Sequence, residues 1–257
     1  MFINNFDPVA FQILSLEIRW YSLAYIIGII LGWIYCKKNL IKDQHILVLF
    51  DDFITYAIVG IILGGRLGYA IFYNLKYYLE SPLEILMLWN GGMSFHGGLI
   101  GVIFATQLFA KKHKVNQFLF LDLVSLSAPI GIFFGRIANF INSELIGKAT
   151  NLPWSVQFVL IDNIKRHPSQ LYEAFFEGII LFLLLRYFFR KNYLQNPGKI
   201  SALFLIFYSL FRFFVEFFRS PDLQIGYLFL NLTFGQLISI IFFSAGVLLL
   251  YLKNNEK

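Results

Sequence analysis

Seven apolar stretches, each near the length of a membrane-spanning helix, constrain the fold of this chain more than any other feature. A helix needs about 20 mostly apolar residues to cross the hydrocarbon core of a bilayer, with a usual range of about 17–25. Hydrophobic residues make up 58% of the chain and charged residues only 14%, which excludes a soluble globular domain. We therefore predict an all-α integral membrane protein, a bundle of about seven transmembrane helices. The predicted spans are residues 20–36, 53–73, 92–110, 118–142, 170–189, 200–219 and 231–252.

The basic residues between these spans are divided unequally between the two sides of the membrane. One set of alternate loops, with the C-terminus, carries eleven: Lys37, Lys38, Lys42, Lys111, Lys112, Lys114, Arg190, Lys191, Lys199, Lys253 and Lys257. The other set carries six: Arg19, Lys76, Lys148, Lys165, Arg166 and Arg219. Because cytoplasmic loops are enriched in Lys and Arg, we expect the N-terminus outside and the C-terminus in the cytoplasm. The same dispersal into loops argues against nucleic acid as a partner, although the net charge is +6.

The chain is expected to form a single polytopic membrane domain over residues 1–257, since no linker rich in Ser, Gly or Pro separates two parts. Residues 1–19 are predicted to form an outer segment, and residues 253–257 a cytoplasmic tail. Residues 143–169 are predicted to form a long outer loop without clear secondary structure, and loops of this length are usually functional or mobile.

Other features of the spans have structural interpretations. Glycines recur at a spacing typical of close helix packing in membranes, as in Gly60, Gly64 and Gly68. The adjacent Asp51 and Asp52 are interpreted as charges at the start of a helix. Cys36 is the single cysteine, which excludes an internal disulfide and favours a structural thiol. The histidines show no metal-ligand spacing, so no metal site is expected: His45, His96, His113 and His167.

Polar side chains interrupt the apolar stretches at one predicted level of the membrane. An ionisable residue at membrane depth is costly unless it faces protein or water, so it is a candidate functional residue by default. Arg136 and Asn139 share a helix face with Phe140 and Ser143, because positions i, i+3, i+4 and i+7 align on a helix. We therefore predict a polar site in the outer half of the bundle. Its further candidate residues are Tyr21, Arg66, His96, Tyr208, Arg212 and Glu216.

Several candidates have a second interpretation. Arg66 binds either loop carbonyls or lipid headgroups, and Tyr21 is either a site residue or an interfacial anchor. Glu216 is placed to pair with Arg212, and the pair either orients Arg212 for function or is only a structural contact. His96 stands among small residues, which leave space beside its ring and favour a functional role.

Six ordered motifs give the chain a family resemblance over nearly its whole length. They are residues 19–21, 64–69, 91–98, 135–147, 166–173 and 212–222. Together they resemble the bacterial prolipoprotein diacylglyceryl transferases. One departure is Ala138, where the signature within residues 135–147 usually has glycine; the extra methyl group removes no reacting group.

The resemblance implies an enzyme of the bacterial cytoplasmic membrane that uses no cofactor. Such an enzyme transfers the diacylglyceryl group of phosphatidylglycerol to the thiol of the lipobox cysteine of a prolipoprotein signal peptide, and releases glycerol 1-phosphate. Arg136 with Asn139 is then expected to hold the headgroup, because a guanidinium grips phosphate through two donors. Arg212 would stabilise charge on the leaving phosphate, and His96 would take the thiol proton. The remaining candidate substrate-binding residues are Asn142, Glu144, Tyr21, Arg66 and Glu216.

Two other classes compete with this interpretation. A non-enzymatic transporter of lipids or small anions would also need buried arginines, but it predicts polar groups on both sides of the membrane midplane. An intramembrane protease is disfavoured because the sequence has no Gly-x-Ser-x-Gly, no His-Glu-x-x-His and no paired intramembrane aspartates.

Overall fold

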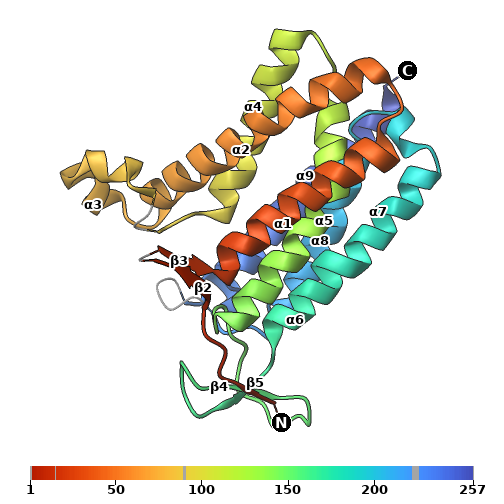
Figure 1. Ribbon diagram of the computed structural model, residues 1–257. Coiled ribbons are helices and arrows are strands. Elements are labelled where there is room, and N and C mark those ends of the chain that lie inside the picture. The colour runs from red at the N-terminus through yellow and green to blue at the C-terminus, as the bar shows by residue number, and fades with distance from the viewer. Residues whose placement is uncertain (1, 15, 89–90, 222–225, 257) are drawn as a thin grey trace. The chain divides into compact units, whose positions relative to one another are not determined.

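The computed structural model describes residues 2–14, 16–88, 91–221 and 226–256, and helices predominate in it (Figure 1). The chain forms two compact units, one made of residues 1–36 and 122–257 and the other of residues 37–121. Three residues named in the sequence predictions lie outside the described residues: Met1 of the segment 1–19, Asp222 of the motif 212–222 and Lys257 of the tail 253–257.

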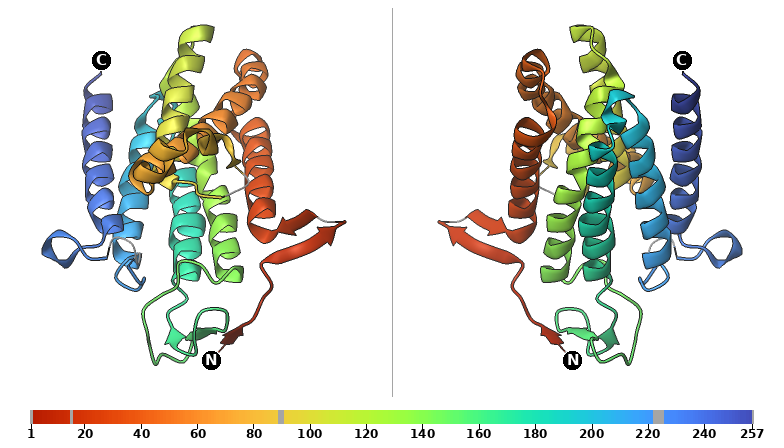
Figure 2. Two further views of the ribbon diagram at one scale, coloured as in Figure 1. Left: turned by 90° about the vertical axis from the view of Figure 1, so that its left-hand side faces the viewer. Right: turned by 90° about the vertical axis from the view of Figure 1, so that its right-hand side faces the viewer.

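In the first unit the long helices run side by side in the order α9, α8, α7, α5 and α1 (Figure 2). The ends of α5 and α8 and the starts of α1, α6 and α9 lie at one end of this unit, towards the small strands (Figure 1). The helices are α1 (Trp20–Tyr35), α5 (Gln117–Ile141), α6 (Ser169–Glu173), the π-helical η4 (Ala174–Ile180), α7 (Leu181–Arg190), η5 (Tyr193–Gln195), α8 (Lys199–Val215), η6 (Phe229–Asn231) and α9 (Phe234–Asn255).

Side chains fix where α8 and α9 begin. The carboxylate of Asp122, on α5, accepts the backbone N–H of Gly198 at 2.8 Å and that of Ser201 at 2.7 Å, so it caps α8 from a neighbouring helix. Thr233 and Gln236 form a reciprocal capping box at the start of α9. These contacts satisfy amides that would otherwise be unpaired at the helix starts.

Glycine allows close helix packing in the first unit. A Cβ added to Gly28 of α1 would lie 2.8 Å from the Cα of Gly131 in α5. One added to Gly178 of η4 would lie 2.8 Å from the Cβ of Phe133, also in α5. The prediction that small residues let these helices approach closely is therefore confirmed at both contacts.

The described part of the chain contains five short strands, which correct the expectation of an all-α fold. They are β1 (Phe2–Asn4), β2 (Val9–Ile13), β3 (Leu16–Arg19), β4 (Val156–Phe158) and β5 (Lys165–Arg166). β1 pairs parallel to β4, β5 pairs antiparallel to β4, and β2 and β3 form a hairpin. The segment 143–169 therefore contains secondary structure. Its strand β4 pairs with β1, which lies more than 150 positions earlier in the chain.

The second unit is built on two helices in direct contact, α2 (Gln44–Phe72) and α4 (Phe95–His113). A Cβ added to Gly64 would collide with the carbonyl oxygen of Gly97, and one added to Gly68 would lie 2.7 Å from the Cα of Gly97. The predicted glycine contact is confirmed here as well. The remaining elements are η1 (Cys36–Leu40), α3 (Leu75–Glu80) and η2 (Pro82–Leu86).

The interpretation of Asp51 and Asp52 as helix-start charges is wrong. α2 begins at Gln44, because the side chain of Asp43 accepts the N–H groups of His45 at 2.8 Å and Ile46 at 3.4 Å. Asp51 therefore lies inside the helix, where its carboxylate pairs with Lys37 at 2.7 Å.

Within the described residues, four helical segments are long and apolar enough to cross a membrane by length and composition. They are Trp20–Leu40, Gln44–Phe72, Gln117–Ile141 and Phe234–Asn255. The other three predicted spans occur as α4, as the helical run from α6 through α7, and as α8, which has 17 residues.

Candidate functional site

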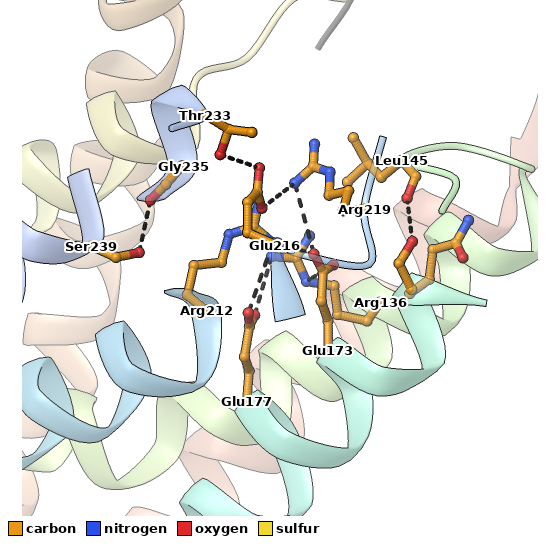
Figure 3. Close-up of polar contacts among 12 residues, drawn as sticks. Arg136, Leu145, Glu173, Glu177, Arg212, Glu216, Arg219, Thr233, Gly235 and Ser239 are labelled. Carbon is orange, nitrogen blue, oxygen red and sulfur yellow. Dashed lines mark hydrogen bonds and ion pairs between the residues drawn. The ribbon is translucent and has the colours of Figure 1, made fainter. Parts of the chain in front are cut away.

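Three arginines and three glutamates meet at the end of the first unit where α5 and α8 finish (Figure 3). We call Arg136, Arg212 and Arg219 the arginine cluster, and Glu173, Glu177 and Glu216 the glutamate set. Arg136 comes from α5, Glu173 and Glu177 from the α6–η4 helix, and the other three from the end of α8 and the residues after it. The site therefore joins three segments that are far apart in the sequence.

Glu173 lies at the centre of these contacts. Its Oε2 is 3.0 Å from Nε of Arg136, and its Oε1 pairs with Nη1 of Arg212 and lies 3.7 Å from Nη1 of Arg219. The side chain is 0% exposed. A carboxylate buried so completely needs cations and donors around it, and here three guanidiniums share it.

Glu177 and Glu216 complete the pairing. Oε2 of Glu177 lies 3.2 Å from Nη2 of Arg136, and its Oε1 lies 3.8 Å from Nη1 of Arg212. Oε2 of Glu216 lies 2.8 Å from Nη2 of Arg212, which confirms that these two residues pair. Thr233 donates its hydroxyl to Oε1 of Glu216 at 3.0 Å, so the start of α9 helps to hold that carboxylate.

The helix that carries Glu173 and Glu177 changes type between them. Glu173 ends α6, and Glu177 lies in the π-helical segment η4. The two residues are four positions apart, which places them on nearly the same face of the helix, and the π-helical turn between them is wider than an α-helical one. Both carboxylates can therefore point at the same guanidiniums, as Figure 3 shows for Glu177 and Arg212. Such widened turns occur frequently at functional sites.

Next to the arginine cluster, the end of α5 forms a polar turn. Asn139 donates to Oε2 of Glu144 at 2.8 Å, and Asn142 donates to Oε1 of the same carboxylate at 3.3 Å. The backbone of Ser143 and of Leu145 has positive φ, 58° and 54°, so the chain reverses sharply here. The structure brings Asn139, Asn142 and Glu144 together as one group.

Backbone contacts join the segment after this turn to the arginine cluster. Lys148 donates its N–H to the carbonyl of Phe218 at 2.8 Å, and Ser220 donates to Ile146 at 3.1 Å. On the other side, His167 donates to the carbonyl of Lys148 at 3.0 Å. Gly147 is required at this crossing, because a Cβ there would lie 2.7 Å from the Cβ of His167 and collide with its carbonyl.

Two titratable side chains within residues 143–169 have pKa values shifted from the ordinary ones. Burial, with the nearby charge of Lys148, lowers the pKa of His167, whose Nδ1 lies 3.2 Å from the hydroxyl of Tyr172. Hydrogen bonds from Arg166, the shortest 2.5 Å, lower the pKa of Asp162. The loop is thus held by a neutral imidazole and an ionised carboxylate near neutral pH.

The candidate Tyr21 opens α1 in the same unit, and its hydroxyl lies 3.5 Å from that of Tyr25. The two rings meet edge to face with centroids 5.0 Å apart. This geometry agrees with either interpretation of Tyr21, as a site residue or as an interfacial anchor.

The candidates Arg66 and His96 belong to the second unit. Arg66 is 2% exposed, and its five N–H groups donate to backbone carbonyls of the following loop: Glu84, Ile85, Met87, Gly91 and Gly92. These contacts favour loop binding over headgroup binding for Arg66. His96 is the second residue of α4 and is half-buried, after Ser94, whose hydroxyl caps the helix at Gly97.

Sequence reasoning gave no role to Glu173 or Glu177, and it counted Arg219 among the basic residues of one side of the membrane without assigning it to the site. The available indication was that a permanent cation within an apolar helix requires a partner, and that the run after Pro168 contains two acids four positions apart. Among the described residues, no group of three or more His, Cys, Asp or Glu side chains is arranged to hold a metal ion.

Comparison with known proteins now identifies the fold family. The profile of the family described as "Prolipoprotein diacylglyceryl transferase" matches residues 8–252. The chain belongs to this family. A "Phosphatidylglycerol--prolipoprotein diacylglyceryl transferase" of Rickettsia bellii (strain OSU 85-389) is 49% identical over 253 residues, which cover 97% of this chain and 96% of that protein. The proteins of the same name from Rickettsia typhi and Rickettsia akari are both 50% identical, over 93% of this chain and 93% and 94% of their own lengths.

Membership in the prolipoprotein diacylglyceryl transferase family confirms the resemblance drawn from the motifs. The departure at Ala138 is accommodated by the structure, where this residue is 2% exposed and its small side chain lies within the packed part of α5.

Proposed function

We propose that this chain transfers the diacylglyceryl group of phosphatidylglycerol to the thiol of a prolipoprotein. Family membership and the names of the relatives support this reaction class. The observation that carries the proposal is the arginine cluster, in which Arg136 and Arg212 are held by buried carboxylates while 15% and 12% of their side chains remain exposed. A phosphate headgroup is the ligand class that such guanidiniums bind.

The proposed reaction is a nucleophilic substitution at carbon. The thiolate of the lipobox cysteine forms a C–S bond with carbon 3 of the diacylglycerol, and the bond from that carbon to the phosphate oxygen breaks. The electron pair stays on the phosphate, so glycerol 1-phosphate leaves as a monoester. The thiol proton passes to a base, for which we propose His96, because an imidazole titrates near neutral pH.

In this proposal Arg136 and Arg212 have different roles toward the phosphate. Arg136, with Asn139, holds the headgroup, while Asn142, Glu144 and Tyr21 line the approach to it. Arg212, oriented by Glu216, stabilises the negative charge that grows on the leaving oxygen. The 2.8 Å contact between Arg212 and Glu216 supports this orientation.

For location, we propose a single polytopic domain of seven spans in the bacterial cytoplasmic membrane. The count of basic residues supports an outer N-terminus, outer segments 1–19 and 143–169, and a cytoplasmic tail 253–257. The arginine cluster comes from the ends of α5 and α8, and these helix ends lie at one end of the first unit (Figure 1), which supports a site in the outer half of the bilayer. A prolipoprotein cysteine just exported through the membrane would meet the site there.

Topology is tested by reporter fusions at residues 43, 80, 113, 155, 194 and 225. The expected locations alternate in, out, in, out, in and out. A cytoplasmic signal at 155 would refute the proposal, because it would place the end of α5 and Arg136 on the side away from exported substrates.

The deciding experiment for the function is mass spectrometry of a lipobox peptide after incubation with the purified protein and phosphatidylglycerol. The expected product is a thioether-linked diacylglyceryl peptide, with glycerol 1-phosphate in equal amount. A transporter of lipids or small anions, the alternative, would leave the peptide unmodified and move labelled phosphatidylglycerol across a sealed vesicle. That pair of results would overturn the proposed function.

A further inference from the structure

Glu173 and Glu177 have no part in the reaction proposed above, although they contact both arginines assigned to the phosphate. Their side chains are 0% exposed, whereas those of Arg136 and Arg212 are 15% and 12% exposed. The carboxylates therefore contact the guanidiniums from the protein side. The exposed side of each guanidinium is left for a ligand.

The charges of the two groups balance. The arginine cluster carries three positive charges and the glutamate set three negative charges, so the formal sum for the six residues is zero. A phosphodiester headgroup brings one negative charge, whereas a phosphate monoester carries about 1.5 to 2 at neutral pH. A site with net positive charge would hold the more highly charged product more tightly than the substrate.

Within the glutamate set, Glu177 is the carboxylate with the fewest stabilising contacts. Glu173 contacts all three arginines, and Glu216 is held by Thr233. Glu177 contacts only two arginines of the cluster, at 3.2 Å and 3.8 Å, and no hydroxyl group holds it as Thr233 holds Glu216 among the described residues. Replacing it with glutamine changes the charge and keeps the volume.

We propose that Glu177 is a positioning residue that, with Glu173, keeps the arginine cluster electrically balanced so that the phosphate product can leave. The proposal rests on the proposed function, because it concerns the release of glycerol 1-phosphate. The carboxylates hold the guanidiniums in place for the diester and oppose the extra charge of the monoester. The rate of product release therefore depends on the buried carboxylates that contact the guanidiniums.

The experiment uses the full-length protein in vesicles of phosphatidylethanolamine and phosphatidylglycerol, with a lipobox peptide and added glycerol 1-phosphate. Glu177→Gln should lower the inhibition constant of glycerol 1-phosphate at least about tenfold, because one opposing charge within a few ångströms is gone. Steady-state kcat should fall more than the single-turnover rate, since release becomes slower. Glu177→Asp, which keeps the charge, should restore the wild-type inhibition constant.

Asp122→Asn is the matched control. Asp122 is also a buried carboxylate, 0% exposed, but it accepts hydrogen bonds from Gly198 and Ser201 rather than from the arginine cluster. Its variant should keep the wild-type inhibition constant even if its thermal stability falls. A merely structural role for Glu177 would likewise lower activity without any gain in product affinity.

The outcomes separate the inference from the proposed function. If the wild type transfers no diacylglyceryl group in these vesicles, the function fails. If it does, and Glu177→Gln folds but shows an unchanged or higher inhibition constant, the inference alone fails. If that variant does not fold, wild-type binding decides: glycerol 1-phosphate should bind no more tightly than the diester glycerophosphoglycerol, and tenfold tighter binding of the monoester would overturn the inference.

Discussion

Arg66 in the second unit and Arg136 in the first are both arginines within apolar helices. The guanidinium of Arg66 contacts neutral carbonyls, whereas that of Arg136 contacts carboxylates. Arg66 donates to five neutral carbonyls of one loop and is 2% exposed. Arg136 pairs with two carboxylates from another helix, and 15% of its side chain is open. Carbonyls that surround a guanidinium use every donor and fix a loop. Carboxylates on one side fix the guanidinium and leave donors for a ligand.

Substitution of Arg136 is expected to cause the greatest loss of activity. Arg136→Ala should abolish transfer, and Arg136→Lys should recover little, because an ammonium cannot donate in the planar fork of a guanidinium. We expect a loss of at least about 10²-fold for the lysine variant, the scale on which one preorganised donor acts. The measurement is turnover with phosphatidylglycerol vesicles. Near-normal turnover in Arg136→Lys would show that no two-donor contact to phosphate matters.

A second test asks whether His96 and Arg212 differ as a base differs from a charge stabiliser. His96→Gln should lose roughly 10²–10⁴-fold in rate, the usual range for positioned proton transfer. Raising the pH should partly rescue that variant, because a free thiol ionises unaided as its pKa of about 8.5 is approached. Arg212→Gln should show no such rescue. Equal, pH-independent losses in the two pH–rate profiles would make His96 a structural residue.

On the side of Arg66, the expected loss is one of stability. Arg66→Lys leaves several buried carbonyls of the loop at residues 84–92 without donors, and each such group costs about 1–3 kcal/mol. The variant should unfold at lower temperature and be cleaved faster in this loop, while the KM for phosphatidylglycerol of the folded fraction stays near wild type. A raised KM with unchanged stability would move Arg66 into the group that binds substrate.

Lowering the pH is expected to destabilise the segment at residues 143–168 slightly more than the loop at residues 81–92. Because the pKa of His167 is lowered in the folded state, the unfolded chain binds the proton more readily. The stability contributed by the neutral ring is therefore complete above about pH 6.5 and is lost as the pH falls through the folded value. Limited proteolysis at pH 7.5 and 5.5 should show faster cleavage within residues 143–168 at the lower pH. Cleavage within residues 81–92 should change less, and His167→Gln should remove the difference.

Periodicity and length were sufficient to predict the helices, because an apolar run of membrane length has few alternatives. The start of α2 was missed, since the interpretation used the paired charge of Asp51 and Asp52 and overlooked Asp43, whose side chain caps the helix. The small sheet was missed because β1 pairs with β4 across most of the chain, and such pairing leaves no local pattern in three residues.

Within the site, the cations were predictable and their partners were not. An arginine in an apolar run is conspicuous on its own, as Arg136 and Arg212 were. Glu173 and Glu177 become their partners only when the α6–η4 helix packs beside α5 and α8. The pairing of Glu216 with Arg212 was predicted because both lie on one helix, four positions apart.

The glycine contact between α2 and α4 also has a rotational consequence. Where Gly64 meets Gly97, backbone touches backbone, so turning α4 about its own axis would drive a side chain into α2. The rotation of α4 about its own axis is therefore fixed at Gly97. Neighbouring side chains on a helix point about 100° apart, so the fixed rotation at Gly97 also sets the direction of the His96 side chain. The aim of the proposed base is thus set by a residue with no side chain.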